Sequence, residues 1–127
     1  MARHKSPGPT DREMAILSVL WERGPSTVRE VHEALNADSD TGYTTTLKLM
    51  QIMADKGLLS RKDAGRQHIY RPVASQEKTQ NQVVAEVLEK VFAGSAEKLV
   101  MRALSARKVS AEELKRIREM LDEMEGT

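Results

Sequence analysis

The chain has 127 residues, no cysteine, 3% aromatic residues and a formal net charge of +1 at pH 7. The lack of cysteine excludes disulfide bonds, thiolate metal sites and a cysteine nucleophile, and few aromatic residues beside many aliphatic ones favour helices over a β-sandwich. No apolar run approaches the ~20 residues needed to span a bilayer, so we expect a soluble, cytoplasmic protein.

Two short helices are predicted near the start of the chain. Thr10 and Glu13 have the Thr-x-x-Glu spacing of a capping box, in which side chain and backbone hydrogen-bond reciprocally. The helix that they open should end at Gly24, which is followed by proline. Thr27 and Glu30 repeat the spacing and open a second helix. The apolar stripes of both helices are expected to enter a core.

A third helix is predicted over residues 44–56, after a turn at 36–42 that is rich in Asp, Ser and Gly. Gly57 is the expected C-terminal cap. Helical spacing divides this segment into two faces. The face expected to pack on the first two helices consists of Thr46, Leu47, Met50, Met53 and Ala54, and the opposite face consists of Thr44, Thr45, Lys48, Leu49 and Ile52.

The exposed face of the third helix carries groups that suit duplex DNA. Threonine hydroxyls can contact phosphates or bases, and Lys48 can contact a phosphate or a guanine. Leu49 and Ile52 could touch thymine methyl groups. Thr44 could equally serve as the N-cap of the helix, and the two roles are compatible.

A two-stranded ribbon is predicted next, with strands at 58–62 and 67–71 around the hairpin-compatible pair Ala64-Gly65. A helix that fits the major groove, followed by a short ribbon with a cation at its tip, is typical of a winged helix-turn-helix.

Side chains of the ribbon supply further candidates for contact with the DNA backbone. Arg66 at the tip is the leading candidate for a backbone or minor-groove contact, with weaker candidates in Arg61, Lys62 and Arg71. The single His68 is predicted to be a packing residue rather than a metal ligand or pH sensor. Tyr70 is expected to be half-buried between ribbon and helix.

Positive charge is concentrated in the third helix and the ribbon. Residues 43–72 hold six Lys or Arg against two Asp, a net charge of +4, whereas residues 75–127 have a net charge of −1. Such a patch attracts polyanions through counterion release, although a solvated charged surface would give the same count.

The C-terminal third is predicted to form three amphipathic helices, over 75–93, from Ser95, and from Ser110, where Ser-Ala-Glu-Glu is a capping box. Helices this short need a partner, and we expect a dimerisation domain over residues 75–127 after a DNA-binding domain over 1–74. The alternative is that they fold back onto the winged domain. The residues expected at the dimer seams are Val84, Val87, Leu88, Val91, Leu99, Val100, Leu114, Ile117, Leu121 and Met124.

Five short motifs resemble, in order, the penicillinase repressor (BlaI/MecI/CopY) family, and the resemblance covers nearly the whole chain. It implies a homodimeric repressor that binds inverted-repeat operators through the third helix and wing, and that dimerises through its C-terminal helices. The motifs are Trp21-Glu22-x-Gly24, Thr27-Val28-Arg29-Glu30-Val31, Tyr43-Thr44-Thr45, Lys56-Gly57-Leu58 and Gly65-Arg66-x-His68-x-Tyr70-Arg71-Pro72.

The chain also departs from the family pattern. The cysteine cluster of copper-responsive members is missing, so thiolate control by copper or zinc is excluded. Some relatives are inactivated by cleavage of an Asn-Phe bond, linked to a membrane-bound metallopeptidase sensor, but Arg102-Ala103 stands in that place. We therefore expect that proteolysis can relieve repression, but the sequence assigns no cleavage site. An exposed-face arginine of the family is replaced by Ile52, which alters the expected base preference.

Three other classes of protein compete with a repressor. A ligand-sensing regulator of the MarR type usually has a long dimerisation helix before its winged domain, but only about nine residues precede the first helix here. An adaptor would use the fold without affinity for DNA. No enzyme, metal or cofactor is expected, because His4, His32 and His68 lie in a tail, a helix and a strand without metal-ligand spacing, nucleophile elbow or phosphate loop.

Overall fold

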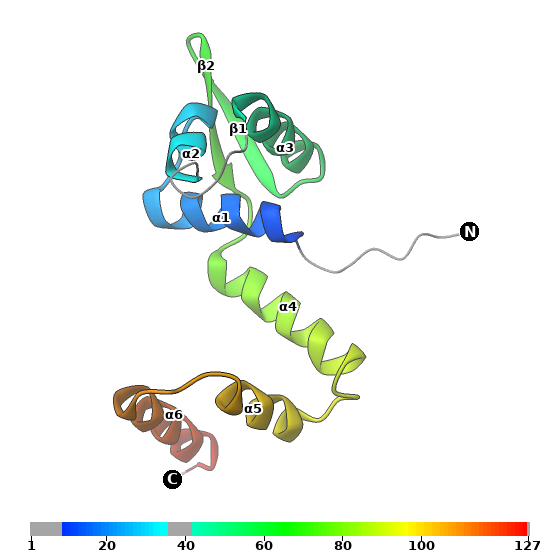
Figure 1. Cartoon of the computed structure of the whole chain (residues 1–127), viewed down its shortest axis with the longest axis vertical. Coiled ribbons are helices and arrows are strands. Elements are labelled where there is room, and N and C mark those ends of the chain that lie inside the picture. Colours follow the sequence, from blue (N-terminus) through cyan, green and yellow to red (C-terminus); the bar gives the residue numbers. More distant parts are fainter. Residues whose placement is uncertain (1–8, 36–41, 127) are drawn as a thin grey trace, which may run out of the picture. The chain divides into compact units, whose positions relative to one another are not determined.

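The computed structural model describes residues 9–35 and 42–126, which form six helices and one two-stranded antiparallel sheet (Figure 1). The predicted fold class, mainly α with a small β wing, is confirmed. Apart from Gly42, the turn predicted at 36–42 lies outside the described residues. The elements are α1 (Asp11–Arg23), α2 (Val28–Leu35), α3 (Tyr43–Asp55), β1 (Leu59–Ala64), β2 (Gln67–Pro72), α4 (Gln76–Lys90), α5 (Ala96–Ser105) and α6 (Ala111–Met124).

The two capping boxes predicted near the start of the chain are present. At α1, Thr10 Oγ1 accepts a hydrogen bond from the Glu13 amide at 3.2 Å, and Glu13 Oε1 accepts one from the Thr10 amide at 3.0 Å. At α2, Thr27 and Glu30 exchange the same two bonds at 3.1 and 2.9 Å. Each box satisfies amide groups that have no partner inside the helix, so the side chains mark where both helices begin.

The end of α3 is a Schellman motif centred on Gly57. Lys56 is the C-cap and Gly57, with φ of 87°, lies one residue beyond it. The Gly57 amide donates to the Ala54 carbonyl at 3.1 Å, and the Leu58 amide donates to the Met53 carbonyl at 2.9 Å. The predicted end of the helix is confirmed, and the glycine supplies the positive φ that the motif requires.

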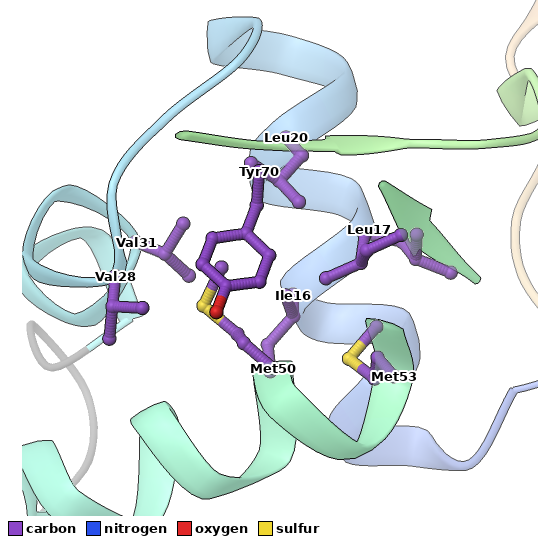
Figure 2. Packing of buried hydrophobic residues seen from close by; sticks show 9 residues of the cluster. Ile16, Leu17, Leu20, Val28, Val31, Met50, Met53 and Tyr70 are labelled. Carbon is purple, nitrogen blue, oxygen red and sulfur yellow. The ribbon is translucent and has the colours of Figure 1, made fainter. Parts of the chain in front are cut away.

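The hydrophobic core is built from the first three helices and the root of the wing (Figure 2). Tyr70 is 0% exposed, so the prediction that it is half-buried is wrong. Its backbone pairs with Ser26 through two hydrogen bonds of 2.8 and 3.0 Å, and this bridge directs the ring inward between the helices. The buried hydrophobic residues are Ile16, Leu17, Leu20, Val28, Val31, Met50, Met53, Leu59 and Tyr70.

One ion pair connects α1 to the end of α3. Glu13 is 3% exposed, and its Oε2 lies 2.7 Å from Lys56 Nζ. Burial alone would raise the pKa of the Glu13 carboxyl, but hydrogen bonds from Lys56 and Thr10 and the charge of Lys56 outweigh burial and hold the pKa below its usual value of 4.5. Glu13 therefore has two structural roles, in the helix cap and in the contact between helices.

Replacing Glu13 with Gln is expected to lower the free energy of unfolding at neutral pH by about 1 to 3 kcal/mol, because Lys56 loses a charged acceptor. The folded-state pKa of Glu13 is depressed, so its contribution is present above the unfolded-state pKa and is lost as pH falls through the folded-state value. Urea unfolding followed from neutral to acidic pH should give a flatter profile for Glu13→Gln than for the parent. An exposed control on the same helix, Glu22→Gln, should retain the parent profile; equal flattening there would contradict the role of Glu13.

The chain divides into two compact units, Met1–Ala85 and Glu86–Thr127. The first turns of α4 pack within the first unit, where Trp21 Nε1 donates to the Ala74 carbonyl at 3.1 Å and Thr79 is buried. The boundary predicted after residue 74 stays a prediction.

Helices of the C-terminal unit begin close to their predicted positions. Ser95 and Ser110 cap α5 and α6, and each side-chain oxygen accepts a hydrogen bond from the amide three positions ahead at 3.1 Å. Only this half of the capping box predicted at Ser110 is found among the described residues. The helix predicted over 75–93 ends earlier, at Lys90, and Gly94 follows with φ of 82°. No side chain described between residues 86 and 126 is buried, so the apolar residues of this unit have no core of their own.

Candidate nucleic-acid interface

The two faces of α3 are as predicted, with one exception. Thr46, Met50 and Met53 are buried, while Thr44, Thr45, Lys48 and Ile52 on the other side are exposed. Leu49 was placed on the exposed face, but it is half-buried and packs against the core. An apolar side chain at the edge of a helical stripe is stabilised when it turns toward the core, because apolar surface leaves water. Less of the Leu49 surface is therefore available for contact with a partner.

A shallow hollow of about 200 Å³ lies over the exposed face of α3. The five exposed-face residues named from the sequence line it together with Arg12. Arg12 belongs to the first turn of α1, and no sequence motif marks it as a candidate for the interface. Packing of α1 on α3 brings Arg12 to the hollow that Lys48 also lines, and the hollow therefore combines two cations, two hydroxyls and apolar side chains.

The N-cap alternative for Thr44 is wrong. The helix begins at Tyr43, one residue earlier than predicted, so the N-cap is Gly42, which has extended backbone and makes no side-chain capping bond. Thr44 consequently lies within the first turn of α3, where its side chain lines the hollow.

The wing is a regular hairpin that is longer than predicted. Its strands pair from Leu59 with Pro72 to Ala64 with Gln67, so Gly65 and Arg66 form the two-residue loop instead of Ala64-Gly65. Gly65 has φ of 69°, which suits the first position of a type II′ turn. Arg66 therefore lies at the tip, and the other basic residues of the ribbon, Arg61, Lys62 and Arg71, are exposed along it.

The prediction that His68 packs in the protein is wrong. Its side chain is 43% exposed, and its Nδ1 lies 2.6 Å from Asp63 Oδ1, on the cross-strand partner in the hairpin. The wing extends beyond the three helices that cover its root (Figure 1), so only the residues near Tyr70 reach the core. His68 is too far along the ribbon to be covered.

A second hollow, of about 180 Å³, lies between the wing and the beginnings of α2 and α3. Arg66, Gln67 and His68 line it from the wing, and Arg29 and Tyr43 line it from the helices. The guanidinium carbon of Arg29 lies 5.3 Å from the centre of the Tyr43 ring. Sequence reasoning selected only Arg66 of these residues, because their proximity depends on packing between elements distant in sequence.

Residues 9–35 and 42–126 contain no cluster of three or more His, Asp or Glu side chains arranged to hold a metal ion. None of the described helices has both the length and the apolar character needed to cross a bilayer.

Comparison with known proteins gives a family match over residues 9–123, to the penicillinase repressor family. The chain is 33% identical over 118 residues to the transcriptional regulator BlaI of Mycobacterium tuberculosis, covering 91% of this chain and 84% of that protein. It is 23% identical over 119 residues to the penicillinase repressor of Bacillus licheniformis, covering 94% and 93% of the two chains.

Solved structures match the chain at low sequence identity. Reduced AbfR bound to DNA has a TM-score of 0.49 and 19% identity over 76% of this chain and 74% of that chain. A transcriptional regulator from Thermotoga maritima has a TM-score of 0.49 and 16% identity over 93% and 80% of the two chains.

Proposed function

Because the chain belongs to the penicillinase repressor family of DNA-binding transcriptional regulators, we propose that it is a homodimeric repressor that binds inverted-repeat operators. The family consists of regulators and not enzymes. The observation that carries the proposal is the exposed face of α3, which lies beside a cationic wing in one compact unit. Family membership also favours a repressor over a ligand-sensing regulator of the MarR type.

In the proposed complex, α3 enters the major groove with its exposed face toward the bases. The Thr44 and Thr45 hydroxyls and Lys48 supply polar contacts, and Ile52 offers an apolar surface for a thymine methyl group. Arg66 reaches the adjacent backbone or minor groove from the tip of the wing, with Arg61 and Lys62 behind it. Arg12, which lines the same hollow as Lys48, adds a cation for a phosphate next to the groove.

The dimer is proposed to form through the C-terminal helices. Leu121 and Met124 of α6 are 54% and 72% exposed, and Val91, the residue after α4, is 68% exposed. Packing these side chains against a second copy would remove them from water, which is favourable by about 25 cal/mol per Å² of apolar surface. A two-fold dimer would place its two α3 helices on half-sites about 34 Å apart, or a multiple of that spacing. The remaining seam residues are Val84, Val87, Leu88, Leu99, Val100, Leu114 and Ile117.

Replacing Lys48 with Ala is expected to weaken operator binding by about tenfold, and to reduce the slope of log affinity against log salt by about one unit if Lys48 contacts a phosphate. If Lys48 contacts a guanine, the loss of affinity should instead be confined to operators that have that guanine. Fluorescence anisotropy at several salt concentrations would measure both quantities. The matched control is Lys98→Ala, on exposed α5, and unchanged operator binding by Lys48→Ala would exclude Lys48 from the interface.

Genomic footprinting with the purified protein tests the proposed function as a whole. Protected sites should consist of two inverted half-sites separated by about one helical turn of DNA or a multiple of it. The same sites would identify the regulated genes and would provide the operator duplex for binding measurements. A protein that protects no sequence and shows no salt-dependent affinity for duplex DNA would be an adaptor and not a repressor.

We further propose that repression is relieved by proteolysis in the C-terminal unit, linked to a membrane-bound metallopeptidase sensor. The proposal follows from the family relationship and from the exposure of α5 and α6, which leaves both helices accessible in a single chain. A cut between the dimer helices would separate the two DNA-binding units and remove the advantage of linked binding. Immunoblots of the tagged chain before and after induction should show a fragment; derepression with intact chain would reject this mechanism.

A further inference from the structure

The hollow between the wing, α2 and α3 differs from the rest of the interface in its charge. Arg29 and Arg66 approach it from α2 and from the wing tip, and His68 lies beside them. No carboxylate is among its lining residues, which the structure describes in full. The nearest acidic side chain on the wing, Asp63, pairs with His68 at 2.6 Å. Among the residues that the structure describes, the two guanidinium groups therefore line a concave surface that holds no carboxylate to neutralise them.

Arg29 is held in place by the ring of Tyr43. The guanidinium lies over the ring at 5.3 Å, a distance at which the negative face of an aromatic ring attracts a cation. Tyr43 is in turn fixed by His32, whose ring meets it edge-on at 5.7 Å and whose Nδ1 lies 3.1 Å from the Thr46 hydroxyl. This chain of contacts limits the rotamers of Arg29, so less conformational entropy would be lost when it binds an anion.

The dimensions of the hollow fit a phosphodiester group. Its volume of about 180 Å³ exceeds that of a few water molecules, each of which occupies about 30 Å³ in the liquid. Guanidinium groups bind phosphate oxygens in a bidentate manner, and two of them approach this hollow from different elements. The hollow also adjoins the N-terminal end of α3, so it would lie over a phosphate that borders the groove in which α3 is bound.

We propose that Arg29, positioned by Tyr43, joins Arg66 in binding one backbone phosphate of the DNA duplex at this hollow. The inference rests on the proposed function, since it assigns a specific phosphate contact within the same interface. Arg29 is the residue that contacts the phosphate, and Tyr43 is a positioning residue. Because the contact is to the backbone, it sets the position of α3 on the duplex and contributes equally to operator and unrelated sequences.

The first test compares four variants in salt titrations of DNA binding. Arg29→Ala should weaken binding about tenfold on both operator and unrelated duplex, and should lower the salt slope by about 0.9 unit. Arg29→Lys should keep the slope but lose part of the affinity, because an ammonium group cannot bind in a bidentate manner. Tyr43→Phe should match the parent, since the ring is retained, whereas Tyr43→Leu should bind more weakly at unchanged melting temperature.

A second test locates the phosphate. Replacing single phosphates of the operator with neutral methylphosphonates should reveal one position at which Arg29→Ala loses less affinity than the parent, because only Arg66 still contacts that phosphate. The exposed control Arg107→Ala should lose affinity there as the parent does. Equal losses for the parent and Arg29→Ala at every position, or an unchanged salt slope in Arg29→Ala, would overturn the proposed contact while leaving the repressor function in place. If the parent itself binds no duplex in a salt-dependent manner, the proposed function fails with it.

Discussion

Replacing Ile117 and Leu121 together with Gln is expected to give a monomer that binds operator DNA about 10² to 10⁴ times more weakly than the parent. Both residues lie on the apolar stripe of α6, and no side chain described in the C-terminal unit is buried within a single chain. Polar groups on this stripe would be desolvated without partners in a dimer, so association should become unfavourable. Light scattering would report the mass of the protein, and anisotropy would report its affinity for the operator.

A matched control lies on the same helix. Lys115→Gln and Glu119→Gln together alter two exposed polar residues and leave the net charge unchanged. This variant should remain dimeric and bind the operator as the parent does. The proposed seam would be wrong if Ile117→Gln/Leu121→Gln stayed dimeric. If it became monomeric without loss of affinity, linkage of two DNA-binding units would not be the source of operator affinity.

Substitutions of Tyr70 are expected to have the largest effects on stability. Two of them should change the free energy of unfolding in opposite directions. Tyr70→Ala should lower the free energy of unfolding by about 3 to 5 kcal/mol, because it empties the centre of the core. Tyr70→Phe should raise it by about 1 kcal/mol, because the Tyr70 hydroxyl is buried without a hydrogen-bond partner among the described residues and phenylalanine fills nearly the same space. Urea unfolding measures both changes.

The phenylalanine variant tests the unpaired hydroxyl specifically. It should bind DNA like the parent, since the ring, the wing root and the paired backbone of Ser26 are preserved. If Tyr70→Phe were instead destabilised by about 1 kcal/mol or more, the hydroxyl would have a partner, such as an ordered water, in the folded protein.

Features governed by neighbouring residues could be predicted from the sequence. The capping boxes at Thr10 and Thr27 depend on two residues three positions apart, so their spacing was sufficient. The end of α3 at Gly57 depends on one residue that tolerates a positive φ. The two faces of α3 follow from helical periodicity, which failed only at Leu49, on the boundary between them.

Features governed by packing between distant elements could not be predicted in this way. The ion pair of Glu13 with Lys56 joins α1 to the end of α3, and Arg12 of α1 lines one hollow with Lys48 of α3. No local pattern marks either arrangement. The depth of Tyr70 and the exposure of His68 depend on how far the helices cover the ribbon. Arg29 stands in a helical segment with ordinary amphipathic spacing, and only the fold brings it over Tyr43.

The backbone bridge between Ser26 and Tyr70 separates the wing into a fixed base and an independent end. The base is tied through Ser26 to the polypeptide before α2, whereas Gly65 and Arg66 in the loop are exposed. Substitutions of Arg66 and the neighbouring exposed residues therefore carry little folding penalty, whereas the φ of 69° at Gly65 favours glycine. Evolution or protein engineering could therefore change the affinity for nucleic acid through those few positions without altering the core.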